Sequence, residues 1–185
     1  MPAALALDLD DTLIDTFPVL HDFIEARLGA RVPGDLLAAY ELSHDPEQAD
    51  ALIDAFFADG VDQTIAARPG ALEGCRLLRA QGFELVVVTS RKPKVAAPTL
   101  ARVEALFPGL FADIRCVGHS GDKNAALADI GARLFIDDHF PHVQRAAEIG
   151  VASILFGDMP WNHGKDWPNR ALDWDALLAA IARLA

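Results

Sequence analysis

The side chains best suited to chemistry lie in four short groups that are far apart in the sequence. The groups are Asp8-Leu9-Asp10-Asp11-Thr12, Thr89-Ser90, Gly121-Asp122-Lys123 and Asp137-Asp138. Crowded carboxylates repel one another unless a cation lies among them, and oxygen ligands favour a hard ion such as Mg²⁺. Hydroxyls at a strand end and a lysine at a helix start are donors suited to phosphate oxygens. Together with a spare carboxylate that could attack phosphorus, these groups indicate phosphoryl transfer through an aspartyl-phosphate.

A parallel β-sheet is the scaffold that would bring the four groups together. Short apolar runs that stop abruptly at polar residues are typical of buried parallel strands. We predict such strands at residues 3–8, 83–89, 113–117, 133–137 and 151–156. Apolar residues at helical spacing lie between them, and a last helix is expected to begin with Asp173 as its N-cap. Because ligands bind at the carboxyl ends of parallel strands, the four groups are expected to converge there.

The segment from Thr16 to Arg68 breaks this alternation of strands and helices. It has no strand pattern, and its apolar residues recur at helical spacing. The two expected helix faces contain Phe17, Leu20, Ile24 and Leu28, and Leu52, Ile53, Phe56 and Phe57. We therefore predict an α/β fold, a Rossmann-like three-layer sandwich with a five-stranded parallel sheet and a small all-helical cap inserted after the first strand. The core would comprise residues 1–15 and 69–185, and the cap residues 16–68.

The composition narrows the possible function classes. With 185 residues, of which 52% are hydrophobic, the chain has enough material for one domain with a substantial core. A formal net charge of -11 opposes binding to nucleic-acid polymers and to anionic membrane surfaces. The two cysteines, Cys75 and Cys116, provide neither a disulfide scaffold nor a zinc finger. Because the N-terminus lacks a basic segment and no long apolar run follows, we expect a cytoplasmic protein.

The four groups resemble the motifs of the haloacid dehalogenase-like hydrolase superfamily and occur in the same order. The resemblance covers nearly the whole chain. The first motif of that family, DxDx(T/V), is similar to residues 8–12. The second, a Thr or Ser that ends a hydrophobic strand, is similar to Val86-Val87-Val88-Thr89-Ser90. The lone lysine of the third motif resembles Lys123, and the acidic pair of the fourth resembles Asp137-Asp138.

The resemblance implies a catalytic role for each matching residue. Asp8 would be the nucleophile, and Asp10 would protonate the leaving oxygen and then activate the water that hydrolyses the intermediate. Thr89 and the backbone around Ser90 would bind phosphate, while Lys123 would neutralise both the phosphate and the nucleophile. The acid at position 10 favours a phosphatase over a dehalogenase, because the dehalogenases of the family lack it.

Mg²⁺ is the cofactor that the resemblance implies. The ion would be held by the carboxylate of Asp8, the backbone carbonyl of Asp10 and the carboxylate of Asp138. Asp137 would not contact the ion but would hold these ligands in position. Which member of the pair Asp137-Asp138 contacts the ion directly stays open at this point.

A narrower resemblance concerns the substrate. Thr89-Ser90-Arg91, Ile136-Asp137-Asp138, the small helical cap and residues 155–162 (LFGDMPWN) are similar to the 5'(3')-deoxyribonucleotidase, or 5'-nucleotidase C, group. This resemblance implies a 5'-nucleotidase that acts on nucleoside monophosphates. One alternative is a phosphatase for another small metabolite, such as a sugar phosphate or phosphoglycolate. Another is a non-catalytic binding module on the same fold, because a fold does not determine a function.

Several residues of the proposed site also have simpler interpretations. Asp10, Asp11 and Thr12 could cap the helix that follows them, because Asp and Thr favour such positions. Lys123 could be a solvated surface lysine, which is the usual environment of lysine. The function therefore depends on the four groups occurring together.

For most of the residues near the four groups in the sequence, we expect structural roles. Mg²⁺ disfavours imidazole, so we interpret His139 and His142 as surface or helix-start residues. The basic residues after the second predicted strand are expected to be solvated, and the aromatic residues of residues 16–68 are expected to form the core of the cap. These residues are Arg91, Lys92 and Lys94, and Phe17, Phe56 and Phe57. Trp161 and Asn162 are expected to be either loop packing or part of the substrate rim.

Overall fold

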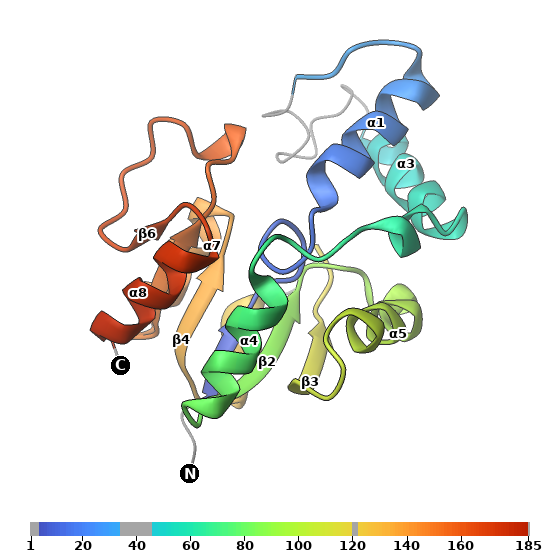
Figure 1. Cartoon of the computed structure of the whole chain (residues 1–185). Helices are drawn as coiled ribbons and strands as arrows, with labels where there is room; N and C mark the ends of the chain where they lie inside the picture. Colours follow the sequence, from blue (N-terminus) through green and yellow to red (C-terminus); the bar gives the residue numbers. More distant parts are fainter. Residues whose placement is uncertain (1–3, 34–45, 120–121, 185) are drawn as a thin grey trace.

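A six-stranded sheet forms the centre of the molecule (Figure 1). The computed structural model describes residues 4–33, 46–119 and 122–184. The strands are parallel and follow the order β3-β2-β1-β4-β5-β6. Their bounds are β1 (Ala4–Leu7), β2 (Glu84–Thr89), β3 (Phe111–Cys116), β4 (Ala132–Asp137), β5 (Ala152–Phe156) and β6 (Arg170–Ala171). Because β1 lies between β2 and β4, the residues that follow these three strands meet at one edge of the sheet.

Helices cover both faces of the sheet and complete a three-layer sandwich. One face is covered by α4 (Ala71–Ala80), α5 (Ala96–Leu106) and α8 (Trp174–Leu184), and the other by α6 (Lys123–Asp129) and α7 (Phe140–Glu148). Side chains of a strand alternate between faces, so Leu5 and Leu7 pack in the first layer while Ala6 packs in the second. The predicted α/β sandwich with a parallel sheet is confirmed.

Two helices and a short turn lie above the carboxyl ends of the strands (Figure 1). They are α1 (Thr16–Leu28), α3 (Pro46–Ala58) and the 3₁₀ turn η1 (Val61–Thr64). The chain enters and leaves this region through two adjacent segments: the N–H of Asp15 donates to the carbonyl of Ala66 (3.0 Å), and the N–H of Arg68 donates to the carbonyl of Leu13 (2.9 Å). Part of the cap proposed at residues 16–68, namely residues 34–45, lies outside the described residues.

The sheet differs from the prediction in its number of strands. The sixth strand, β6, has two residues, which is too short for any hydrophobic pattern, and it pairs with Leu155 and Phe156 of β5. Asp173 caps α8 as predicted, since its carboxylate accepts the N–H of Ala176 (2.8 Å). In the part of the chain that the structure describes, no helix combines the length and apolarity needed to cross a membrane.

Candidate active site

The predicted polar groups meet in one cavity at the carboxyl ends of the strands. The cavity has a volume of about 190 Å³ and lies between the sheet edge and the helices α1 and α3. The residues lining it from the core side include Asp8, Asp10, Asp11, Thr89, Ser90, Lys123, Asp137 and Asp138. Each of them ends or closely follows β1, β2 or β4, or begins α6. The structure therefore brings together residues from each of the four sequence groups that were expected to converge, while Gly121 lies outside the described residues.

Lys123 joins the ends of β1 and β4. Its Nζ lies 2.5 Å from Oδ1 of Asp8 and 2.8 Å from Oδ2 of Asp137, and all three side chains are buried. Burial alone would lower the pKa of Lys123, but the carboxylates of Asp137 and Asp8 raise it above its ordinary value. The lysine is therefore a permanent positive charge in the cavity. It begins α6, where Asp122 accepts the N–H of Asn124 (2.8 Å) as the N-cap.

Burial makes the ionisation of Asp8 and Asp138 costly, and among the described residues only Asp8 of the two forms an ion pair, with Lys123. Burial and the charge of Asp137 raise the pKa of Asp8 to about 7, although Lys123 opposes this shift. Burial and the charges of Asp137 and Asp8 raise the pKa of Asp138 well above its usual range. Among the described residues, no hydrogen-bond donor contacts the carboxylate of Asp138. A divalent cation would offset both penalties, because it supplies the missing positive charge.

The donor set fits Mg²⁺. Carboxylate oxygens of Asp8, Asp137 and Asp138 lie within 4.8 Å of one another, and Mg²⁺ prefers oxygen ligands. Asp137 already accepts hydrogen bonds from Lys123 and from the N–H of His139 (2.8 Å), and it contacts Nδ1 of His142 at 3.1 Å. This arrangement favours Asp138 as the direct ligand and Asp137 as its support.

His139 and His142 occupy the start of α7, and both line the cavity. Burial and the nearby His142 lower the pKa of His139 to about 4. The interpretation of His142 as a plain helix-start residue misses its contact with Asp137, which is supplied by the tertiary structure. Neither imidazole belongs to the acidic cluster, so the described geometry gives them no role as metal ligands.

Asp10 is held by a basic side chain, that of Arg91, which was expected to be solvated. Oδ2 of Asp10 accepts Nε of Arg91 (3.0 Å), and Oδ1 accepts Nη2 of Arg91 (2.8 Å) and the hydroxyl of Thr16 (2.6 Å). Burial would raise the pKa of Asp10, but Arg91 outweighs burial and keeps this pKa below its usual value. The Asp10 carboxylate is therefore ionised and fixed in direction.

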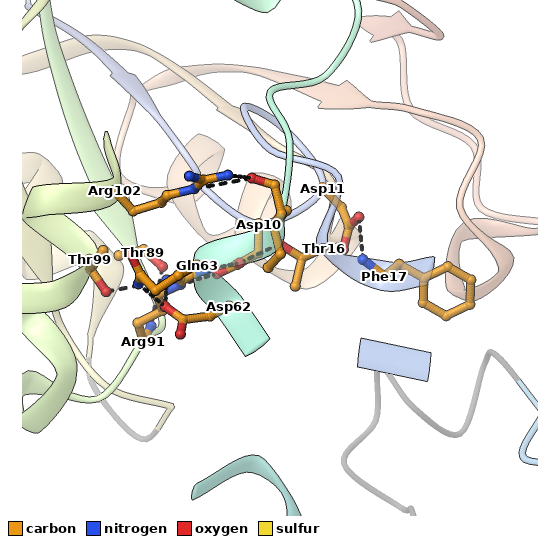
Figure 2. Close-up of polar contacts among 11 residues, drawn as sticks. Asp10, Asp11, Thr16, Phe17, Asp62, Gln63, Thr89, Arg91, Thr99 and Arg102 are labelled. Carbon is orange, nitrogen blue, oxygen red and sulfur yellow. Dashed lines mark hydrogen bonds and ion pairs between the residues drawn. The ribbon is translucent and has the colours of Figure 1, made fainter. Parts of the chain in front are cut away.

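Arg91 is buried, so the prediction that it is solvated is wrong. Its side chain is 2% exposed, and it lies among Asp10, Asp62 and Thr99 (Figure 2). Nη1 of Arg91 lies 3.5 Å from Oδ2 of Asp62, a residue of η1, and its guanidinium lies over the ring of Phe57 at 5.0 Å. The two paired carboxylates offset the cost of burying the guanidinium. Arg91 thereby links Asp10 in the core to the segment that leads out of residues 16–68.

Asp11 and Thr12 are in environments typical of residues that stabilise the fold. Asp11 has a left-handed backbone (φ 59°), and its carboxylate accepts the N–H of Phe17 in the first turn of α1 (2.9 Å). The alternative that this group of residues caps the next helix is thus correct for Asp11. Burial raises the pKa of Asp11 to about 8. Thr12 is fully buried and lies outside the cavity lining.

Thr89 and Ser90 lie at the end of β2 and line the cavity. Thr89 is fully buried, and its hydroxyl accepts the N–H of Arg91 (3.2 Å), which closes a tight turn after the strand. A hydroxyl that accepts one hydrogen bond retains its own proton for donation. Both residues are placed where they could donate to a phosphoryl group that bridges Asp8 and Lys123.

Trp161 and Asn162 belong to the turn η3 (Pro160–Asn162) but differ in their position relative to the cavity. Nε1 of Trp161 donates to the carbonyl of Asp138 (3.1 Å), and its ring lines the cavity, as expected for a rim residue. Asn162 is fully buried, donates to the same carbonyl and accepts the N–H of Phe140 (3.3 Å). Asn162 therefore fixes the backbone behind the acidic pair and is not part of the rim.

The aromatic residues of α1 and α3 belong both to the hydrophobic core of these helices and to the cavity lining. Phe56 is buried as predicted, with 1% of its side chain exposed. Phe17 and Phe57 are partly buried and pack against the hydrophobic cluster formed by α1 and α3, as predicted, and all three phenylalanines also line the cavity. Helical periodicity places such residues on an inner face, but it does not distinguish packing from a cavity wall.

Replacing Arg91 is expected to destabilise the fold strongly. Arg91→Met would leave Asp10 and Asp62 without their cation, which costs about 3–5 kcal/mol of unfolding free energy for a buried pair. Lys94→Met is the matched control, because Lys94 pairs with Asp54 on the surface, where such pairs contribute about 0–1 kcal/mol. Urea unfolding measures both variants. Equal losses for the two would contradict the assignment of Arg91 as the buried link.

Comparisons with known proteins identify the fold. In sequence, no protein-family model and no curated protein matches the chain. In structure, it is similar to a predicted phosphatase from Clostridium acetobutylicum, with a TM-score of 0.76 at 18% identity over 100% of both chains. A haloacid dehalogenase-like family hydrolase from Streptococcus pneumoniae gives a TM-score of 0.74 at 15% identity, over 97% of this chain and 98% of that chain. A predicted phosphoglycolate phosphatase from Haemophilus somnus gives 0.71 at 17% identity, over the same shares. The chain therefore has the fold of the haloacid dehalogenase-like hydrolases.

Proposed function

We propose that this protein is a Mg²⁺-dependent phosphomonoesterase that forms an aspartyl-phosphate at Asp8. The observation that carries the proposal is a buried Asp8 carboxylate, bound by Lys123 and within 4.8 Å of carboxylate oxygens of Asp137 and Asp138. A cluster of this kind supplies a nucleophile, a fixed positive charge and oxygen ligands for a cation in one cavity. The structural neighbours described as phosphatases support the same class of reaction.

In the first half-reaction, the phosphoryl group is transferred to Asp8, and each residue of the site would have its own role in this step. Asp8 would attack phosphorus with a carboxylate oxygen, and Lys123 would hold that carboxylate in place while offsetting the charge of the phosphoryl oxygens. Thr89 and Ser90 would donate to the same oxygens. Mg²⁺, held by Asp8 and Asp138, would supply further charge neutralisation when bound.

Asp10 would act as the acid and then as the base of the reaction. Its two hydrogen bonds from Arg91 favour the ionised form, which is the form that accepts a proton from the hydrolytic water. To protonate the leaving oxygen in the first half-reaction, Asp10 would first have to take up a proton from solvent, and its hydrogen bonds from Arg91 oppose that uptake. Arg91 thus favours the hydrolysis of the intermediate over its formation.

We propose that the substrate is a small phosphorylated metabolite and that the reaction takes place in the cytoplasm. A nucleic-acid polymer is not proposed as a substrate. The sequence resemblance to 5'-nucleotidases suggests a nucleoside monophosphate. The neighbours instead include a predicted phosphoglycolate phosphatase, and none of the neighbours considered above is described as a nucleotidase. The comparisons therefore favour the alternative of a general small-metabolite phosphatase over a dedicated 5'-nucleotidase.

A phosphate-release screen tests the proposed function. Wild-type protein is expected to release inorganic phosphate from at least one member of a panel of nucleoside monophosphates, sugar phosphates and phosphoglycolate, in the presence of Mg²⁺. Asp8→Asn serves as the blank for contaminating phosphatases, because it keeps the shape of the side chain but lacks the nucleophile. Binding of the same compounds without release from any of them would favour a non-catalytic binding module instead.

A further inference from the structure

The cavity has a polar floor and an apolar wall. The floor consists of the acidic cluster, Lys123 and the end of β2, as described above. The wall opposite consists of described residues from α1, α3 and η3. These residues are Phe17, Leu20, Ile53, Phe56, Phe57 and Trp161. A phosphoryl group placed on Asp8 would therefore direct its leaving group toward hydrophobic and aromatic side chains.

The aromatic part of this wall is held in place by specific contacts. Phe17 packs edge-on against Trp161, with ring centroids 5.3 Å apart and an angle of 72° between the rings. Trp161 is anchored through the hydrogen bond from Nε1 to the carbonyl of Asp138. Phe57 packs edge-on against the buried Phe56 at 5.4 Å. A wall fixed in this way loses little conformational freedom when an apolar group binds to it.

The described lysines and arginines of the cavity offer no unpaired cation to a second anionic group on the substrate. Five aspartates and three lysines and arginines line the cavity, and a bound Mg²⁺ would offset two of the aspartate charges. Each of these three cations is already paired: Lys123 with Asp8 and Asp137, Arg91 with Asp10 and Asp62, and Lys92 with Asp50 and Asp54. A leaving-group carboxylate would have to be desolvated against the apolar wall or compete with these pairs.

We propose that the preferred substrate is a phosphomonoester whose leaving group is uncharged and presents a flat apolar ring to Phe17, Phe57 and Trp161. This inference rests on the proposed phosphatase function and specifies the substrate of the same site. Aromatic rings pack favourably against such a wall in stacked or edge-on arrangements. The cavity of about 190 Å³ includes both the polar floor and the apolar wall, so the phosphoryl group and the ring would share it.

The test compares alkyl monoesters whose leaving groups are similar in chemistry but differ in what they present to the wall. The panel consists of 2-phenylethyl phosphate, n-butyl phosphate, glycerol 1-phosphate, phosphoglycolate and nucleoside 5'-monophosphates. We expect kcat/KM for 2-phenylethyl phosphate to exceed that for phosphoglycolate by about 10- to 100-fold, mainly through KM, because burial of a ring is a binding effect. A kcat/KM that is higher for nucleotides than for 2-phenylethyl phosphate would identify the ring as a nucleobase. A kcat/KM that is lower for nucleotides would identify a simpler ring.

Two variants connect this preference to the wall. Phe17→Leu and Phe57→Leu remove a ring from the wall and are expected to reduce the ratio of the two kcat/KM values by about 3- to 10-fold. Phe111→Leu is the matched control, because Phe111 is a partly buried phenylalanine of β3 that packs against Phe107 away from the cavity. Its ratio should stay at the wild-type value.

The outcomes separate the inference from the function on which it rests. Asp8-dependent phosphate release that is fastest with phosphoglycolate or glycerol 1-phosphate, with a ratio unchanged in both wall variants, would overturn the aromatic substrate and leave the phosphatase intact. Absence of Asp8-dependent release from every monoester of the panel would overturn the proposed function itself. A preference for the ring that is lost in either wall variant and kept in Phe111→Leu would support the inference.

Discussion

Asp8→Asn is expected to lower turnover by about 10⁴-fold or more and to leave no phosphoenzyme, because the amide cannot attack phosphorus. Asp10→Asn is expected to lower turnover by about 10²–10⁴-fold through the loss of acid–base catalysis. It should still form a phosphoenzyme, because Asp8 and Lys123 are unchanged. Rapid-quench labelling with a phosphorylated substrate measures both quantities. Wild-type turnover in Asp8→Asn, together with loss of the phosphoenzyme in Asp10→Asn, would reverse the two roles.

Stability measurements distinguish a chemical defect at Asp8 from an unfolded protein. Burial and Asp137 raise the pKa of Asp8 from 3.8, its ordinary value, to about 7, so the metal-free fold loses stability as the pH rises between these two values, and the full penalty is present above pH 7. The neutral isostere removes this penalty, while Lys123 keeps Asp137 as a partner. In the absence of Mg²⁺ at pH 8, Asp8→Asn is therefore expected to unfold at the same urea concentration as wild type or at a higher one. A large drop in the midpoint would attribute the loss of activity to misfolding.

Chelation of divalent ions is expected to abolish hydrolysis, and added Mg²⁺ to restore it, because two buried carboxylates need a cation to share the cavity with a phosphate. The same ion should stabilise the folded chain, by about 2.7 kcal/mol when its concentration is 100 times the dissociation constant. Asp138→Asn should remove most of this stabilisation, since Asp138 has no hydrogen-bond donor among the described residues and lies in the acidic cluster. Thermal unfolding with and without Mg²⁺ measures the effect independently of activity.

Asp62→Asn is the matched control for the metal experiment. Asp62 is buried, with 1% of its side chain exposed, but it pairs with Arg91 and is outside the acidic cluster. Its replacement should lower the stability of the metal-free protein while leaving the increment from Mg²⁺ unchanged. Full activity of the wild type after verified removal of metal, or an unchanged increment in Asp138→Asn, would contradict the metal site.

The local sequence determined the elements and their order. Apolar runs that end in acids or hydroxyls mark three of the strands well, β1, β2 and β4, because a buried parallel strand needs apolar side chains on both faces and polar residues where it leaves the core. Once β1, β2 and β4 are parallel neighbours, Asp8, Thr89 and Asp137 must lie at one edge, so the position of the site follows from the pattern. Strand β6 escaped prediction because its two residues pair through backbone hydrogen bonds, which carry no side-chain pattern.

The environment of each polar side chain was decided only by the tertiary structure. Arg91 and Asp10 are 81 residues apart, and nothing in the local sequence shows that the guanidinium is enclosed by Asp10, Asp62 and Thr99. The same holds for Phe17, whose helical spacing is that of a core residue although it faces the cavity. Periodicity reports which side of an element turns inward, whereas burial, pairing and access to a cavity depend on distant segments that pack against that side.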